Sequence, residues 1–170
     1  MKRFHLFSTM VLLVGAIGGF PVMAAAEQVF TRLTGFQEAP PAATNASGDF
    51  LARINNNEQS IDYTLTYQNL GSNVRMAQVH LGQPGVNGGV SVWLCTTPNA
   101  PVQAPVDTPM CPQSGVVTRT IEPADVVGPG NQGLEPEDMA ELIQAIRAGV
   151  TYANVHTQNF PDGEIRGQIQ

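Results

Sequence analysis

The sequence predicts an all-β fold: an antiparallel two-sheet β-sandwich with one short helix at about 136–148. Three observations lead to this prediction. Apolar and polar residues alternate with a period of two through most of the chain, turns rich in Gly, Pro and Asn separate these runs, and only one segment has helical spacing. Because each short strand buries one face, we expect two packed sheets to enclose one core.

The clearest predicted strands are 50–55 and 61–68, where apolar residues occupy every second position. The Asn-rich segment 55–58 between them is typical of a turn, so these two strands are expected to pair as a hairpin. Further strands are expected at 90–95, 150–157 and 164–170, and weaker ones at 29–33, 74–81 and 116–121.

The segment 136–148 breaks this alternation. Its apolar residues recur at helical spacing, at Met139, Leu142, Ile143 and Ile146. Acidic residues at its start and Arg147 near its end suit the helix dipole, and Gly149 is a typical C-terminal stop. We expect this helix to cover one opening of the β structure, with its apolar stripe in the core.

The first 26 residues are typical of a secretory signal peptide. Lys2 and Arg3 precede an apolar run that begins at Met10, and small residues lead to Ala26, after which cleavage is expected. The run is shorter than the ~20 residues that span a bilayer, and Gly and Pro interrupt it, so no membrane span is expected after the signal is removed. Residues 27–170 are then expected to be a single domain, periplasmic or secreted.

The charge of the chain argues against nucleic acid and anionic membranes as partners. Eight Lys and Arg residues face fourteen Asp and Glu residues. Two of the basic residues lie in the predicted signal peptide, so the mature chain has a net charge of −8. Its remaining basic residues are scattered arginines, which do not form the basic patch that binding to phosphates requires.

The two cysteines, Cys95 and Cys111, are expected to form a disulfide, because an oxidising compartment favours pairing. The segment between them contains four prolines, so it is expected to run over the surface outside the sheet. A redox-active or metal-binding pair would need closer spacing, such as Cys-x-x-Cys.

Two histidines, His80 and His156, are candidate metal ligands. Met76 shares the strand face of His80, and Asn154 shares that of His156. If the two strands are neighbours, the imidazoles converge with a thioether, a ligand set that suits copper. In the alternative interpretation each His hydrogen-bonds backbone or carboxylate groups. The absence of a His-x-His pair favours this alternative.

Near the C-terminal end, Glu164, Arg166 and Gln168 share one strand face after a Pro-Asp-Gly turn. A carboxylate and a guanidinium at this spacing can bind a ligand, but more often fix the register of neighbouring strands. The chain has neither a Gly-x-Ser-x-Gly nucleophile motif nor a phosphate-binding Gly-rich loop, and 85–90 is typical of a tight turn. No catalytic residue is therefore assigned, and we do not expect an enzyme.

Five segments carry motifs that resemble the CHRD domain family, named for repeats in the vertebrate protein chordin. They are 33–41, 77–82, 85–90, 149–157 and 161–168, the last of which reads Pro-Asp-Gly-Glu-Ile-Arg-Gly-Gln. Within these motifs a structural role is expected for four residues, Glu38, Asn154, Glu164 and Arg166.

The resemblance implies an immunoglobulin-like β-sandwich with a remote likeness to copper–zinc superoxide dismutase, and no established activity. The first His of the family's His-x-His segment is Gln78 here, so a dismutase-like site lacks an imidazole. We expect a non-catalytic binding module without a cofactor, whose partner is an extracytoplasmic protein or an envelope or matrix component. The alternative is a redox-type protein that binds copper or zinc through His80, His156 and Met76.

Overall fold

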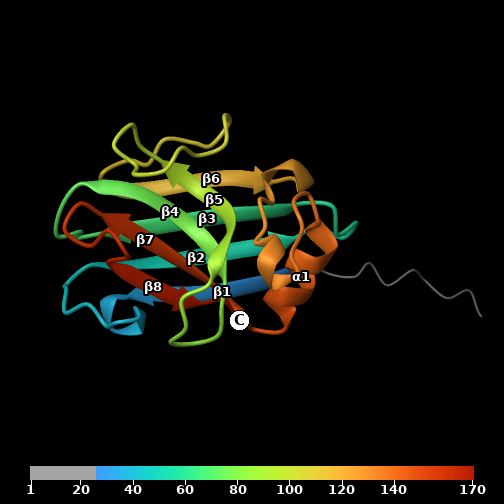
Figure 1. The fold of residues 1–170 in the computed structure, drawn as a ribbon, viewed down its shortest axis with the longest axis horizontal. Coiled ribbons are helices and arrows are strands. Elements are labelled where there is room, and N and C mark those ends of the chain that lie inside the picture. The colour runs from blue at the N-terminus through green and yellow to red at the C-terminus, as the bar shows by residue number, and fades with distance from the viewer. Residues whose placement is uncertain (1–25) are drawn as a thin grey trace, which may run out of the picture.

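The computed structural model describes residues 26–170, so the predicted signal peptide lies outside the described residues except for Ala26. Eight antiparallel strands pair in the order β5-β4-β7-β8-β1-β2-β3-β6 (Figure 1). The strands are β1 (Glu27–Thr34), β2 (Ser47–Ile54), β3 (Ile61–Gln68), β4 (Val74–Leu81), β5 (Gly89–Thr96), β6 (Gly115–Ile121), β7 (Thr151–Thr157) and β8 (Ile165–Gln168). Across 26–170, no helix has the length and apolar character needed to cross a membrane.

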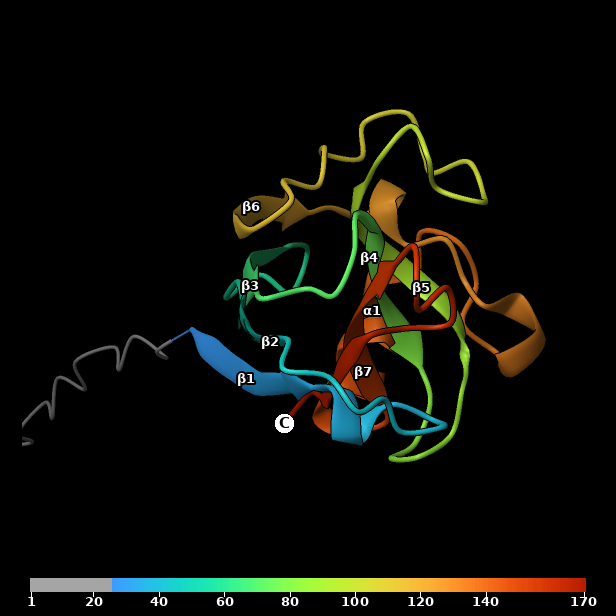
Figure 2. The same ribbon diagram turned by 90° about the vertical axis from the view of Figure 1, so that its left-hand side faces the viewer.

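The all-β class is confirmed, but the strands form one continuous sheet and not two separate ones. The short strand β8 joins the two halves, because Thr34 of β1 pairs with Arg166 and the Phe30 N–H donates to the Gln170 carbonyl at 2.9 Å. The sheet curls until β5-β4-β7-β8 faces β1-β2-β3-β6 across a shared core (Figure 2). Alternation shows that each strand has one buried face, but it does not show whether a strand at the seam connects two layers.

The predicted hairpin of β2 and β3 is confirmed. The two strands pair along their whole length, from Ser47 opposite Gln68 to Ile54 opposite Ile61. Phe50, Ala52 and Ile54 are buried, and the residues between them are exposed, as the alternation predicts.

The helix α1 (Met139–Arg147) is shorter than the predicted span of 136–148. Asp138 caps it, because its carboxylate accepts the Glu141 N–H at 3.0 Å. Glu137 has a φ of +67°, which no α-helix accommodates, so the helix cannot begin at Pro136. Its four apolar side chains are buried, and it covers one end of the curled sheet as predicted (Figure 1).

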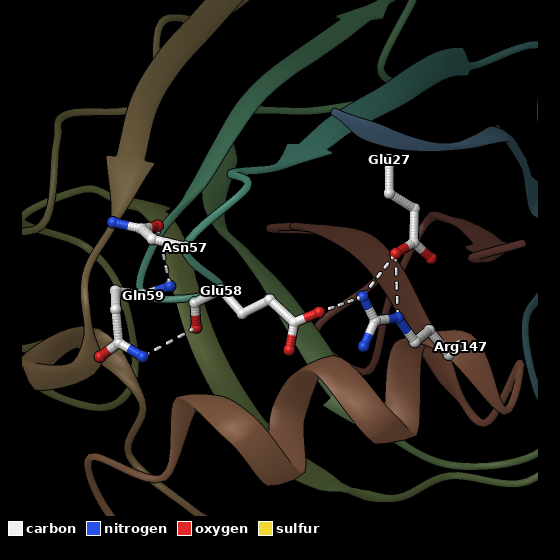
Figure 3. A network of polar contacts seen from close by, with 5 residues as sticks. All are labelled: Glu27, Asn57, Glu58, Gln59 and Arg147. Carbon is white, nitrogen blue, oxygen red and sulfur yellow. Dashed lines mark hydrogen bonds and ion pairs between the residues drawn. The ribbon is translucent and has the colours of Figure 1, made fainter. Parts of the chain in front are cut away.

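Arg147 joins the end of α1 to two distant parts of the chain (Figure 3). Its guanidinium lies 2.7 Å from a carboxylate oxygen of Glu27, at the start of β1, and 2.7 Å from one of Glu58, in the β2–β3 turn. These hydrogen bonds raise the pKa of Arg147. Because all three side chains are largely exposed, the network orients the helix more than it stabilises the fold.

The predicted disulfide between Cys95 and Cys111 is confirmed, with the sulfur atoms 2.00 Å apart. The segment between them runs over the surface, and Val106 at its centre is 96% exposed. The segment returns to the sheet only at its end, where the Cys111 N–H donates to the Thr96 carbonyl at 2.9 Å. The prediction of a surface excursion is therefore confirmed.

Candidate functional site

The outer face of β4, β7 and β8 carries polar side chains that are almost completely buried. Three loops lie against this face, at 35–42, 82–88 and 158–163. We use the name polar cluster for the side chains gathered there, which are Glu38, His80, Tyr152, Asn154, His156 and Arg166. They come from four of the sequence motifs and are brought together only by the pairing of the strands and the packing of the loops.

The strands that carry the two histidines are direct neighbours. In the pairing of β4 with β7, Met76 lies opposite His156 and His80 lies opposite Tyr152. Side chains of directly opposite residues in an antiparallel pair lie on the same face. The ring centroids of His80 and His156 are 6.1 Å apart, so the structure does bring the two predicted candidates together.

Tyr152 is the centre of a stack of three side chains. The His80 ring is parallel to it within 4°, at a centroid distance of 4.9 Å. The guanidinium carbon of Arg166 lies 3.4 Å from the centre of the Tyr152 ring, which is a cation–π contact. Because His80 comes from β4 and Arg166 from β8, the stack ties together the strands on both sides of β7.

Arg166 is 1% exposed and donates to the loop at 82–88. Its guanidinium donates to the carbonyl oxygens of Gln83 and Val86, both at 3.0 Å, and to Oδ1 of Asn87 at 3.3 Å. Burial lowers the pKa of Arg166. Within residues 26–170 no carboxylate forms an ion pair with it, so its charge is stabilised mainly by carbonyl dipoles and an aromatic ring.

Glu38 is 5% exposed, and its Oε1 has no hydrogen-bond partner. The carboxyl group lies against Gly163, whose φ of +130° and lack of a Cβ are both required there, because a Cβ would collide with Oε1. Burial raises the pKa of Glu38 to about 7, although attraction to Arg166 opposes this shift. Glu38 is therefore partly protonated near neutral pH.

Backbone carbonyl groups hold the rings of both histidines in the same way, through Nδ1. Nδ1 of His80 lies 3.0 Å from the Gly88 oxygen, and Nδ1 of His156 lies 2.9 Å from the Pro161 oxygen. Burial lowers the pKa of His80 to about 4 and also lowers the pKa of His156. Each ring is then neutral at pH 7, and because a carbonyl only accepts, the hydrogen lies on Nδ1 and the lone pair on Nε2.

Glu164 lies outside the polar cluster, and the predicted common face with Arg166 is wrong. Glu164 precedes the first residue of β8, and its side chain is fully buried outside the polar cluster. Its carboxylate accepts hydrogen bonds from the hydroxyl groups of Thr44 and Thr157 and from the Gly71 N–H, at 2.7 to 2.8 Å. It joins three distant segments of the chain and does not pair with Arg166.

An open cleft of about 460 Å³, here called the Glu38 cleft, lies beside the polar cluster. Its walls include Phe36, Glu38, Pro41, Pro84, Arg166 and Gln168. Gln168 donates to the carbonyls of Gly82 and Gly149, both at 2.9 Å, while its own Oε1 is buried without a partner. Two unpartnered acceptor oxygens therefore belong to residues that line one cleft.

A second cleft of about 460 Å³ lies on the opposite half of the sheet, where Asp49 and Thr66 contribute to its walls. Among the described residues that line it, none has a buried polar side-chain atom without a partner. Equal volume does not distinguish the two clefts, but the chemistry of their walls does, and it favours the Glu38 cleft as the candidate site.

The sequence predicts the strand face of Gln168 but no role for its side chain, and it predicts only a turn at 85–90. Alternation locates a side chain on a face, but it does not show whether every polar atom finds a partner. The backbone carbonyl groups of Gln83 and Val86 accept hydrogen bonds from Arg166. No sequence motif can reveal this role, because every residue type has a backbone carbonyl group.

One of three comparisons with known proteins identifies a family for this chain. A family model described as CHRD domain matches residues 29–169, which include the whole polar cluster. Neither the curated proteins nor the solved structures contain a match to the chain. Since the family model covers most of the sequence, the chain belongs to the CHRD domain family.

Proposed function

We propose that this CHRD chain is an exported, non-catalytic binding module, and that it binds a hydroxyl-rich, uncharged part of an envelope or matrix polymer in the Glu38 cleft. One observation carries the proposal: Oε1 of Glu38 and Oε1 of Gln168 are buried without partners, and both residues line this cleft. The predicted signal peptide and the Cys95–Cys111 disulfide support a periplasmic or secreted location, since disulfides persist in oxidising compartments.

The charge of the cleft selects an uncharged ligand. A buried acceptor without a hydrogen bond is unfavourable, so a ligand that supplies donors gains binding energy there. An anionic group would lie beside Glu38, whose carboxyl group carries part of a negative charge near neutral pH. A cationic group would face Arg166, whose charge no carboxylate pairs among residues 26–170. Neutral hydroxyl groups avoid both conflicts.

The apolar walls of the cleft fit the ring faces of a sugar. Phe36 is 74% exposed beside the buried polar groups, and Pro41 and Pro84 add further apolar surface. Ligand sites usually combine apolar and aromatic walls with a few placed polar groups. A saccharide presents both kinds of surface, because its ring faces are apolar and its edges carry hydroxyl groups.

The same walls argue for binding without catalysis. No Ser, Thr, Cys or Lys side chain lines the Glu38 cleft, so a covalent nucleophile of these types is missing there. The pKa of about 7 suits Glu38 for general acid work. Glycoside hydrolysis normally needs a second carboxylate, however, and Glu38 is the one carboxylate among the described residues that line this cleft. Asp162 lines, together with Glu38, an adjoining smaller cleft of about 280 Å³.

Calorimetric titration with a panel of neutral envelope and matrix oligosaccharides tests the proposal. Phe36→Ala should weaken binding about tenfold, since one aromatic contact contributes on the order of 1 kcal/mol. Phe30→Ala is the matched control, because Phe30 is 51% exposed on β1 outside the cleft. That variant should bind like the unmodified chain.

Four results would contradict the proposal. Absence of binding to every neutral oligosaccharide, or an equal loss in Phe30→Ala, would remove the Glu38 cleft as the site. Tighter binding of matched uronic-acid oligosaccharides would show that the ligand is anionic. Release of new reducing ends that Glu38→Gln abolishes would make the chain an enzyme.

A further inference from the structure

We infer that His80 and His156 form a two-imidazole site for monovalent copper through their Nε2 atoms, with the Met76 thioether beside them. Neither histidine lines the Glu38 cleft, so this inference is independent of the proposed function. Four features of the structure support it: the orientation of the rings, their separation, the position of Asn154, and the charge of the surrounding groups.

The orientation of the rings directs both Nε2 atoms away from the backbone carbonyls, and Asn154 contacts that of His156. The carbonyl oxygens of Gly88 and Pro161 each accept from Nδ1, which is the arrangement that outer partners impose on metal-binding histidines. Nε2 of His80 is completely buried and has no hydrogen-bond partner. A lone pair buried in this way is unfavourable unless something binds it.

The separation of the rings fits one shared ion. A metal–imidazole bond is ~2.0–2.1 Å long and the nitrogen lies ~1.2 Å from the ring centre, so with a bond of ~2.0 Å two rings on one ion have centroids at most about 6.4 Å apart. The observed 6.1 Å is close to this limit and therefore implies a wide nitrogen–metal–nitrogen angle. A tetrahedral ion would require about 5.2 Å by the same bond length.

Asn154 shows that the two Nε2 atoms face a common space. Its side-chain oxygen lies 3.1 Å from Nε2 of His156. In the pairing of β4 with β7, Asn154 is the diagonal neighbour of His80 on the same face, although it has no hydrogen bond in good geometry with Nε2 of His80. One short side chain on β7 is thus adjacent to both rings.

The charge of the surroundings favours a monovalent ion. Within residues 26–170 no group of three His, Cys, Asp or Glu side chains gathers that could form a common zinc site. Arg166 and His80 both stack on Tyr152, so a positive charge lies near the site and opposes a divalent ion more than a monovalent one. Met76, opposite His156 and 7% exposed, supplies the soft ligand type that selects monovalent copper.

The competing interpretation is a purely structural pair of histidines. If the Asn154 amide is turned over, its N–H group donates to Nε2 of His156 and satisfies that ring without a metal. An amide NH2 group has two hydrogens and Asn154 is adjacent to both rings, so this alternative satisfies both histidines only if the second hydrogen reaches Nε2 of His80, with which the structure shows no hydrogen bond. A metal ion would have to displace the Asn154 amide or bind its oxygen.

The test is an anaerobic titration of the full mature chain with monovalent copper against a chromophoric copper chelator. We expect one equivalent of copper per chain, and the same stoichiometry with monovalent silver as a redox-inert substitute. Imidazole ¹⁵N spectra of the unmodified chain should show the Nε2 resonances of both histidines move while the Nδ1 resonances stay. This readout needs no variant and so does not depend on whether a substituted chain folds.

Variants then assign the ligands. His80→Gln and His156→Gln should each lower the copper affinity by about 100-fold or more, since even an outer-shell partner is worth 10- to 100-fold. Met76→Leu should lower it about tenfold, whereas Met110→Leu, which changes a 61% exposed methionine away from the site, should not. Failure to compete with the chelator, unchanged Nε2 resonances, or full affinity in both histidine variants would each overturn the inference.

Discussion

The two halves of the curled sheet differ in how far their outer faces are buried. In β1, β2 and β3 buried and exposed or half-buried residues alternate, so the outer face carries solvent-contacting side chains such as Arg53 and Asp62. In β7 all seven residues are buried, and β4 is buried on both faces through most of its length. The first half has one covered face, and the second has two.

This difference identifies the candidate site. A second covered face is normally apolar, because buried polar groups need partners. Here it contains a buried arginine, two neutral histidines and a carboxyl group with an unpartnered oxygen. Loops, and not a second layer of secondary structure, supply the cover, and loops are the parts of a fold that most often carry binding groups.

The largest expected effect contrasts two arginines, one from each half. Arg166→Met should lower the free energy of unfolding by about 4 kcal/mol, because it removes three charged hydrogen bonds and leaves two loop carbonyls without their donor. Arg53→Met should change it by no more than about 0.5 kcal/mol, since its ion pair with Asp62 is exposed. Chemical denaturation measures both, and equal losses would show that the two halves do not differ in this way.

A second contrast uses pH. Glu38 holds a proton in the folded chain that the unfolded chain releases above its usual pKa of 4.5. The contribution of Glu38 to the free energy of unfolding should therefore fall by about 3 kcal/mol as pH rises from about 4.5 to 7, and stay reduced above pH 7. Because the lowered pKa values of His80 and His156 act in the opposite direction over this range, the contribution of Glu38 is measured as the difference between the unmodified chain and Glu38→Gln, by denaturation at pH 4, 6 and 8.

Asp62 lies on β3, in the half of the sheet with one covered face, and provides a control in which stability changes with pH in the opposite direction. Hydrogen bonds from Thr120 and Arg53 lower the pKa of Asp62 below 3.8, so its stabilising contribution is present at neutral pH and is lost as pH falls through the folded-state pKa. Asp62→Asn should therefore be less stable than the unmodified chain at pH 7 but not at pH 2. If Glu38→Gln follows this same direction, Glu38 is ionised in the folded chain and the burial argument is wrong.

The smallest expected effect is a gain in the affinity for monovalent copper. Gln78 lies opposite Asn154 and is 2% exposed, on the same face of β4 as Met76 and His80. Gln78→His should raise the affinity for monovalent copper about tenfold and make zinc binding measurable, since a third imidazole completes a common ligand set. Thr64→His, on the outer face of β3, is the matched control and should bind no additional metal. Unchanged affinity in Gln78→His would place the side chain of residue 78 away from the histidines.

Sequence patterns located most of the fold because strands and caps are local. The alternation in 61–68 requires only neighbouring residues, and the register of β2 with β3 follows from their short turn. The start of α1 was misplaced for an equally local reason: Glu137 adopts a left-handed backbone conformation, which composition does not reveal. The continuous sheet was missed because it depends on β8, a strand of four residues.

The sequence by itself determined which residues of this protein alternate, where the α-helix of residues 26–170 lies, that its two cysteines pair, and which motifs assign it to the CHRD family. Only the tertiary structure decided that Glu38 and Arg166 line one cleft and that His80 lies beside His156. The physical reason is that a residue's own periodicity fixes the face on which it lies, whereas strand order and loop packing fix what covers that face. Burial without a partner, which makes these polar groups candidates for function, is a property of that cover.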